Sequence, residues 1–143
     1  MMVENKKHHS VLILLLFAFC LSMINIESSK AIAQETNPDA FKILKEKAIN
    51  PKTGLPKTLD PNLFKGKAKK AYQIAKEIPE ILSQMPCLCE CEPYGHENLL
   101  DCFIDRHGAG WMICQEEALL TKRLHDENIP PNKIKEEIIK RFK

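Results

Sequence analysis

Cysteines are the residues of this chain most able to do chemistry, and three of them alternate along one short segment. Cys87, Cys89 and Cys91, the cysteine triplet, stand two residues apart, and alternate residues of an extended chain point to the same side. A slight curl of the segment therefore aims three sulfur atoms at one point. Thiolates are soft, polarizable donors, so the triplet favours Cu(I) first and Zn(II) second.

Further donors follow the triplet in the chain. Cys102 comes eleven residues after its last member and Cys114 twelve residues later, and both can face the triplet if their segments pack against it. His96, five residues after the triplet, can complete the coordination shell, and His107 and Met112 are additional donors in reach. The predicted metal ligands are Cys87, Cys89, Cys91, His96, Cys102 and Cys114.

The N-terminal stretch has the pattern of an export signal. Lys6 and Lys7 precede an apolar run over 11–23, and the small-residue site Ala31-Ile32-Ala33 follows it. Even at its longest the run is shorter than the about 20 residues that span a bilayer, so we expect cleavage after residue 33. Cleavage removes Cys20 and leaves five cysteines. Membrane contact is expected only if the segment is retained.

The same five cysteines can instead form disulfides, because exported proteins meet an oxidising compartment. Bridges from Cys87 to Cys102 or from Cys91 to Cys114 would tie the triplet to later segments and contribute about 2–4 kcal/mol. The odd count, and a spacing of two that suits a bridge poorly, favour chelation or thiol exchange. A disulfide-stabilised interaction module and a thiol redox protein therefore stay open beside metal binding.

Composition and motifs exclude several function classes. With 143 residues and a net charge of +2, the chain lacks the positive charge of a nucleic-acid-binding protein and the length of a two-domain dinucleotide enzyme. No C-x-x-C-H motif indicates c-type haem, and export of an unfolded chain conflicts with a cytosolic iron–sulfur cluster. No catalytic arrangement of Ser, His and Asp stands out, so we expect a binding protein and not an enzyme.

Short helices must position these donors. Pro79 is expected to interrupt a helical stripe. Residues 86–95 are predicted to form a loop because they hold two prolines and a glycine, and 107–110 is predicted to be a flexible break. In the helix after this break, we expect Leu119, Leu120 and Leu124 on the apolar side and Glu117 in an acidic first turn. Apolar spacing predicts helical segments at 38–49, 68–78, 96–104, 112–125 and 134–142.

These elements predict a small all-α domain of about five short helices around a cysteine-rich loop, since no alternating run is long enough for a sheet. We expect three parts along the chain. They are an export signal at 1–33, an N-terminal helix and loop at 34–60, and a helical cysteine-motif domain at 61–143.

Several short motifs occur together in this chain. They are Met85 to Cys91, Gly95-His96, Leu100 to Ile104, His107, Cys114 and Glu117-Ala118. With them the chain resembles a bacterial family named for a Pro-Cys-Tyr-Cys-Gly-Cys motif, whose members are exported and functionally uncharacterised. Leu88 stands where the motif has Tyr and Glu90 where it has Gly, a residue that permits positive φ. Trp111 stands where similar proteins carry the first cysteine of a C-x-x-C pair.

Together the residues and the resemblance predict an exported protein that captures, buffers or delivers a copper or zinc ion through clustered thiolates. The expected location is extracytoplasmic in a bacterium, which means secreted, periplasmic or on the cell surface. The expected partners are the metal ion and a metal-delivery protein, with no nucleic acid.

Overall fold

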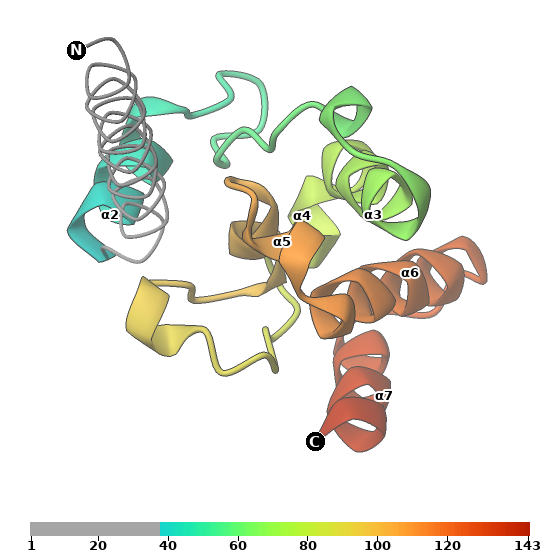
Figure 1. The fold of residues 1–143 in the computed structure, drawn as a ribbon. Coiled ribbons are helices and arrows are strands. Elements are labelled where there is room, and N and C mark those ends of the chain that lie inside the picture. The colour runs from blue at the N-terminus through green and yellow to red at the C-terminus, as the bar shows by residue number, and fades with distance from the viewer. Residues whose placement is uncertain (1–37) are drawn as a thin grey trace, which may run out of the picture. The chain divides into compact units, whose positions relative to one another are not determined.

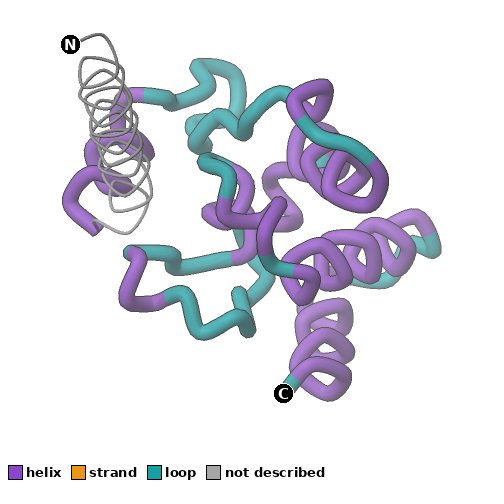
Figure 2. Tube along the Cα trace, in the orientation of Figure 1, coloured by secondary structure: helices purple, strands orange, loops and turns teal. Residues whose placement is uncertain are grey.

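The computed structural model describes residues 38–143 of the chain. The predicted export signal at 1–33, with Cys20, lies outside the described residues. Within the described range the chain is all-α, as predicted, and its one extended pairing is an isolated bridge between Ile49 and Pro56 (Figure 2). None of the helices in this range combines the length and the apolar character that crossing a bilayer requires.

Six α-helices and three 3-10 helices follow one another in the described residues. They are α2 (Pro38–Lys47), η2 (Pro61–Leu63), α3 (Gly66–Glu77), α4 (Pro79–Leu82), η3 (Glu92–Tyr94), η4 (Leu99–Phe103), α5 (His107–Gly110), α6 (Met112–Asp126) and α7 (Pro131–Phe142). The predicted interruption at Pro79 is confirmed, because α3 ends at Glu77 and α4 begins at the proline.

The core lies where α3 packs on α6 and α6 packs on α7 (Figure 1). The predicted stripe of α3 is buried, and Tyr72 at its centre is fully enclosed. Its ring stacks on Phe64 with centroids 3.9 Å apart and meets Phe103 edge-on at 5.1 Å. Its hydroxyl donates a 2.6 Å hydrogen bond to the carbonyl of Asp105. These contacts fix η4 and the start of α5 against α3.

The predicted helix at 96–104 is a shorter 3-10 helix, η4. It begins at Leu99 because the side chain of Asn98 accepts the N–H of Leu100 at 3.0 Å and so caps the first turn. Leu99, Leu100 and Phe103 are buried. The tight 3-10 turn also buries Asp101 and Cys102, so a carboxylate and a thiol lie in the core.

The expectation of a flexible break at 107–110 is wrong, because these residues form the helical turn α5. The carboxylate of Asp105 accepts the N–H of His107 at 2.8 Å, which starts the turn. Gly108 lies against η4 so closely that a Cβ would stand 2.7 Å from the carbonyl oxygen of Cys102. The glycine serves close packing at this position and not flexibility.

The face that α6 buries also differs from the prediction. Leu120 is buried, but Leu119 and Leu124 are only partly so. The fully buried face instead carries Cys114, Glu117, Ala118 and Thr121, at the i, i+3, i+4 and i+7 spacing of a helical stripe. The error arose because hydropathy ranks leucine above cysteine, glutamate and threonine, whereas packing turns the polar face toward the cysteines.

Candidate metal centre

The five cysteines of the described chain meet at one point. The Sγ atoms of Cys87, Cys89, Cys91, Cys102 and Cys114 all lie within 4.8 Å of one another. The sulfur of Cys87 is 2.8 Å from that of Cys89 and 3.0 Å from that of Cys102. Sulfur atoms bound to one tetrahedral ion at 2.3 Å would be about 3.8 Å apart. The sulfurs are therefore close enough together to bind one ion, with a small outward movement of the closest pairs.

Three separate segments supply these sulfurs. The triplet lies in the loop between α4 and η3, Cys102 lies in η4, and Cys114 lies on the buried face of α6. The base of the loop is closed by the N–H of Leu99, which donates to the carbonyl of Met85 at 3.0 Å. Packing of η4 and α6 against the loop thus produces the convergence that the sequence predicted.

The loop curls at Glu90, which has a φ of +57°. This left-handed conformation is unfavourable for a residue with a side chain and easy for glycine. The finding explains why the motif of the resembling family has glycine at this position. The curl turns Cys89 and Cys91 toward the same centre from either side of Glu90.

One pair of the triplet is already joined in the structure. Cys89 and Cys91 form a disulfide, and Cys87, Cys102 and Cys114 are free thiols. The pairing is contrary to the expectation that a spacing of two suits a bridge poorly. Neither bridge considered from the sequence forms. The cluster therefore offers three thiols with the disulfide present and five after its reduction.

The free thiols share their protons unequally. Hydrogen bonds from Cys102 and Cys114 hold the pKa of the half-buried Cys87 well below its usual range. The hydrogen bonds with Cys114 and Cys87, together with burial, raise the pKa of Cys102. The cluster is thus arranged to carry one thiolate, at Cys87, with neighbouring thiols as donors to it. A thiolate is the form that binds a metal.

Two histidines border the sulfurs. The buried ring of His96 places Nδ1 3.6 Å from the sulfur of Cys102. The Nε2 atom of His107 lies 2.8 Å from the sulfur of Cys91 and 3.7 Å from that of Cys89. Cys91, His96 and His107 form a second group whose ligand atoms lie within 4.8 Å of one another.

The two remaining donors considered from the sequence have different positions. His107, named as a donor in reach but not among the predicted ligands, belongs to the second group. Its place depends on α5, a helical turn formed where a flexible break was expected. Met112 is 68% exposed at the start of α6 and belongs to neither group.

Glu117 is an acid that sequence reasoning misplaced. It is fully buried, not part of an exposed acidic turn, because it follows Cys114 by three residues on the same helix face. Its Oε1 accepts the N–H of Leu88, between two cysteines of the triplet, at 3.1 Å, while Oε2 has no partner. Burial, and then the charge of Cys87, raise the pKa of Glu117 to about 8.

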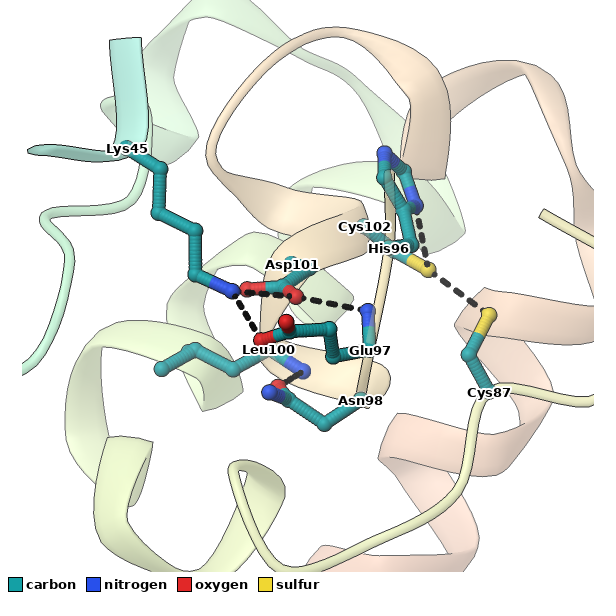
Figure 3. A network of polar contacts seen from close by, with 8 residues as sticks. All are labelled: Lys45, Cys87, His96, Glu97, Asn98, Leu100, Asp101 and Cys102. Atoms are coloured by element: carbon teal, nitrogen blue, oxygen red, sulfur yellow. Dashed lines mark hydrogen bonds and ion pairs between the residues drawn. The ribbon is translucent and has the colours of Figure 1, made fainter. Parts of the chain in front are cut away.

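A salt-bridge network supports the histidine side of the centre. Figure 3 shows Lys45 of α2 reaching Asp101 from one side, while Cys87 approaches the adjacent Cys102 from the other. The ammonium group lies 2.9 Å from the buried carboxylate of Asp101 and 2.8 Å from that of Glu97. The bond from Lys45 lowers the pKa of Glu97. The network attaches α2 to η4.

Aromatic rings enclose both histidines. Phe41 of α2 lies over His96 with ring centroids 4.6 Å apart, and His107 meets His96 edge-on at 4.7 Å. Trp111, half exposed, stacks on His107 with centroids 5.5 Å apart. Trp111 therefore lies at the rim of the second group, beside His107.

Comparison with known proteins gives one match. The family described as a protein of unknown function with PCYCGC motif matches residues 11–143. No curated protein and no solved structure matches the chain. The match supports the resemblance seen in the motifs, and its description assigns neither an activity nor a ligand. Function has to be argued from the geometry of the centre.

Proposed function

Since this chain belongs to the family of proteins of unknown function with the PCYCGC motif, we propose its function from the site itself. The protein binds a soft metal ion, Cu(I) or Zn(II), for capture, buffering or delivery. The observation that carries the proposal is the convergence of five sulfurs, from three segments, within 4.8 Å. The thiolate ligands are those of Cys87, Cys89, Cys91, Cys102 and Cys114, with His96 in support.

The state of the cysteines favours this role over that of a structural staple. A disulfide stabilises chiefly by closing a long loop, and the Cys89–Cys91 bridge encloses a separation of only two residues. The thiols that could join distant segments, Cys87, Cys102 and Cys114, are free. The cysteines that could link distant segments by disulfides are therefore free to bind a ligand.

The surroundings of the sulfurs favour a soft cation. Cys102 and Cys114 are fully buried in an apolar core, where the charge of a thiolate is unfavourable without a compensating cation. A metal ion supplies that charge, and sulfur ligands select Cu(I) and Zn(II) over harder ions such as Mg²⁺. The half-buried Cys87, with its lowered pKa, is the first thiolate that an incoming ion meets.

The proposal extends to location and partners. The N-terminal pattern of charged residues, apolar run and small-residue site supports export, and we place the protein outside the cytoplasm, secreted, periplasmic or on the cell surface. A metal-delivery protein would exchange the ion through Cys87, because this is the cluster's partly exposed thiol.

The test is a metal titration of the reduced protein without oxygen. Cu(I) and Zn(II) are each competed against a chromophoric chelator, and we expect dissociation constants tighter than micromolar. Cys102→Ser should weaken binding by at least about tenfold, or 1.4 kcal/mol. The matched control is Met112→Leu, which removes an exposed sulfur donor that belongs to neither ligand group. Binding weaker than micromolar, or equal binding by folded Cys102→Ser and the control, would refute the proposal.

A second candidate, thiol exchange, rests on the contact between Cys87 and the disulfide. The thiolate of Cys87 lies 2.8 Å from the sulfur of Cys89. Its attack would form a Cys87–Cys89 bond, break the bond to Cys91 and release Cys91 as a thiolate, with no external oxidant. Alkylation of the unreduced protein followed by peptide mapping tests this exchange. Alkylation of both Cys87 and Cys91 supports the exchange. Alkylation confined to Cys87, Cys102 and Cys114 contradicts it.

A further inference from the structure

We propose that the centre holds two metal ions, the second of them bound by Cys89, Cys91, His96 and His107. The inference rests on the proposed function and adds the number of ions and their ligands. Five sulfurs and two imidazole rings make seven donors in the two overlapping groups. One tetrahedral ion uses four donors. Two such ions need eight positions, which seven donors fill when one of them bridges.

The distances identify the bridging donor as Cys91, which is the one residue that belongs to both groups. Its sulfur lies 2.8 Å from Nε2 of His107, and the sulfur of Cys89 lies 3.7 Å from the same atom. The two histidines and this cysteine pair make one sphere. The three remaining cysteines are the free thiols, and with Cys91 they make the other: Cys87, Cys102 and Cys114.

His96 gives independent support for a ligand on this side of the centre. The side chain is only 4% exposed, yet its Nε2 atom has no hydrogen-bond partner. Buried polar atoms are nearly always paired, since leaving one unpaired costs about 1–3 kcal/mol. The ring is held by Phe41 and by the edge-on contact with His107. A buried ring held this firmly beside the sulfurs, with one nitrogen lacking a partner, is available to bind an ion.

The two spheres differ in chemistry. The first is formed by sulfur alone and suits Cu(I) or Zn(II), whereas the second has two sulfurs and two nitrogens, a ligand set typical of Zn(II). The second sphere also contains both members of the disulfide. A dithiol reductant gives the Cys89–Cys91 bond two electrons and two protons and becomes a disulfide itself. The two new thiols lose their protons when the metal binds.

Reduction therefore controls the second ion more strongly than the first. With the Cys89–Cys91 disulfide intact, the first sphere keeps the three thiols of Cys87, Cys102 and Cys114, and the second keeps no sulfur. We expect one Zn(II) per chain in this state and two after treatment with a dithiol. The number of Zn(II) ions bound per chain therefore indicates whether the Cys89–Cys91 pair is oxidised or reduced.

The experiment is Zn(II) loading followed by native mass spectrometry, with and without prior reduction. The reduced wild type should hold two ions, reduced His107→Ala one, and the control His125→Ala, whose histidine lies far along α6, two. Circular dichroism of each variant checks that it is folded. His107→Gln, a larger polar replacement than alanine, should also lose the second ion while keeping the helical spectrum. One ion in the reduced wild type, or two in folded His107→Ala, overturns the inference. No ion in the reduced wild type overturns the proposed function itself.

A site-resolved readout comes from Trp111, the single tryptophan of the chain, which stacks on His107. Binding of the second ion moves or charges the histidine ring, so Trp111 emission should change with the second equivalent of Zn(II) and only in the reduced protein. A change complete at the first equivalent, or equal in both redox states, contradicts the division of ligands.

Discussion

Replacement of Glu117 by glutamine should remove a pH dependence of stability that comes from the acid beside the cysteine triplet. Glu117 is fully buried, and its pKa is raised to about 8 by burial and by the Cys87 thiolate. Glutamine has nearly the same shape and is uncharged at every pH. Its carbonyl oxygen can accept the N–H of Leu88 that Oε1 accepts in the wild type. The substitution therefore isolates the ionisation from the hydrogen bond.

The magnitude follows from linkage. In the unfolded chain a glutamate has a pKa of about 4.3, so between that value and 8 the folded state holds a proton that the unfolded state has lost. Stability then falls as pH rises, by about 1.4 kcal/mol per pH unit. The cost is absent below the unfolded pKa and complete above the folded one. Between pH 5.5 and 7.5 the difference in unfolding free energy between Glu117→Gln and wild type should grow by roughly 2–3 kcal/mol.

The assay is urea unfolding of the metal-free protein, with its Cys89–Cys91 disulfide intact, at several pH values and constant ionic strength. Other groups titrate equally in both proteins and largely cancel in the difference. Glu116→Gln is the matched control, since the side chain of Glu116 is 43% exposed and pairs with Lys67 at the surface, and surface pairs contribute about 0–1 kcal/mol. A difference for Glu117→Gln that stays constant from pH 5.5 to 7.5 would refute the reasoning.

Three further predictions concern the residues around the centre, each measured by urea unfolding. Glu90→Gly should stabilise the protein by about 1 kcal/mol, because φ is +57°, and any loss of stability contradicts this. Gly108→Ala should destabilise by about 1–3 kcal/mol, since its Cβ would lie 2.7 Å from a carbonyl oxygen of η4. The control Gly110→Ala meets nothing within 4 Å, and equal effects of the two would contradict the packing argument. Lys45→Met should cost about 1–3 kcal/mol by leaving Asp101 buried without its cation, and unchanged stability would count against that pairing.

Much of the fold could be predicted because its causes are local. The helical spacing of apolar residues predicted α3, and the missing N–H of Pro79 predicted its end. The misplaced face of α6 and the helical turn α5 have a different origin. Each depends on what packs against the segment, and hydropathy does not report a glycine such as Gly108 that is chosen for close approach.

The candidate centre shows the same division. Alternation of the triplet predicted its convergence, and the spacing to Cys102 and Cys114 allowed them to join it. The sequence offered His107 only as a donor in reach, beside Met112, and did not indicate that Cys89 pairs with Cys91. Those contacts need the loop curled and α5 formed, and both are consequences of tertiary packing.

By itself, then, the amino-acid sequence determined an all-α chain with short helices and a set of soft donors, because backbone preferences and residue chemistry act over a few neighbouring positions. Only the tertiary structure decided which donors meet, which of them are buried, and that Glu117 stands among them. Donors that lie many residues apart come together through the packing of whole helix faces. The free energy of that packing is distributed over the core, so no single motif predicts it.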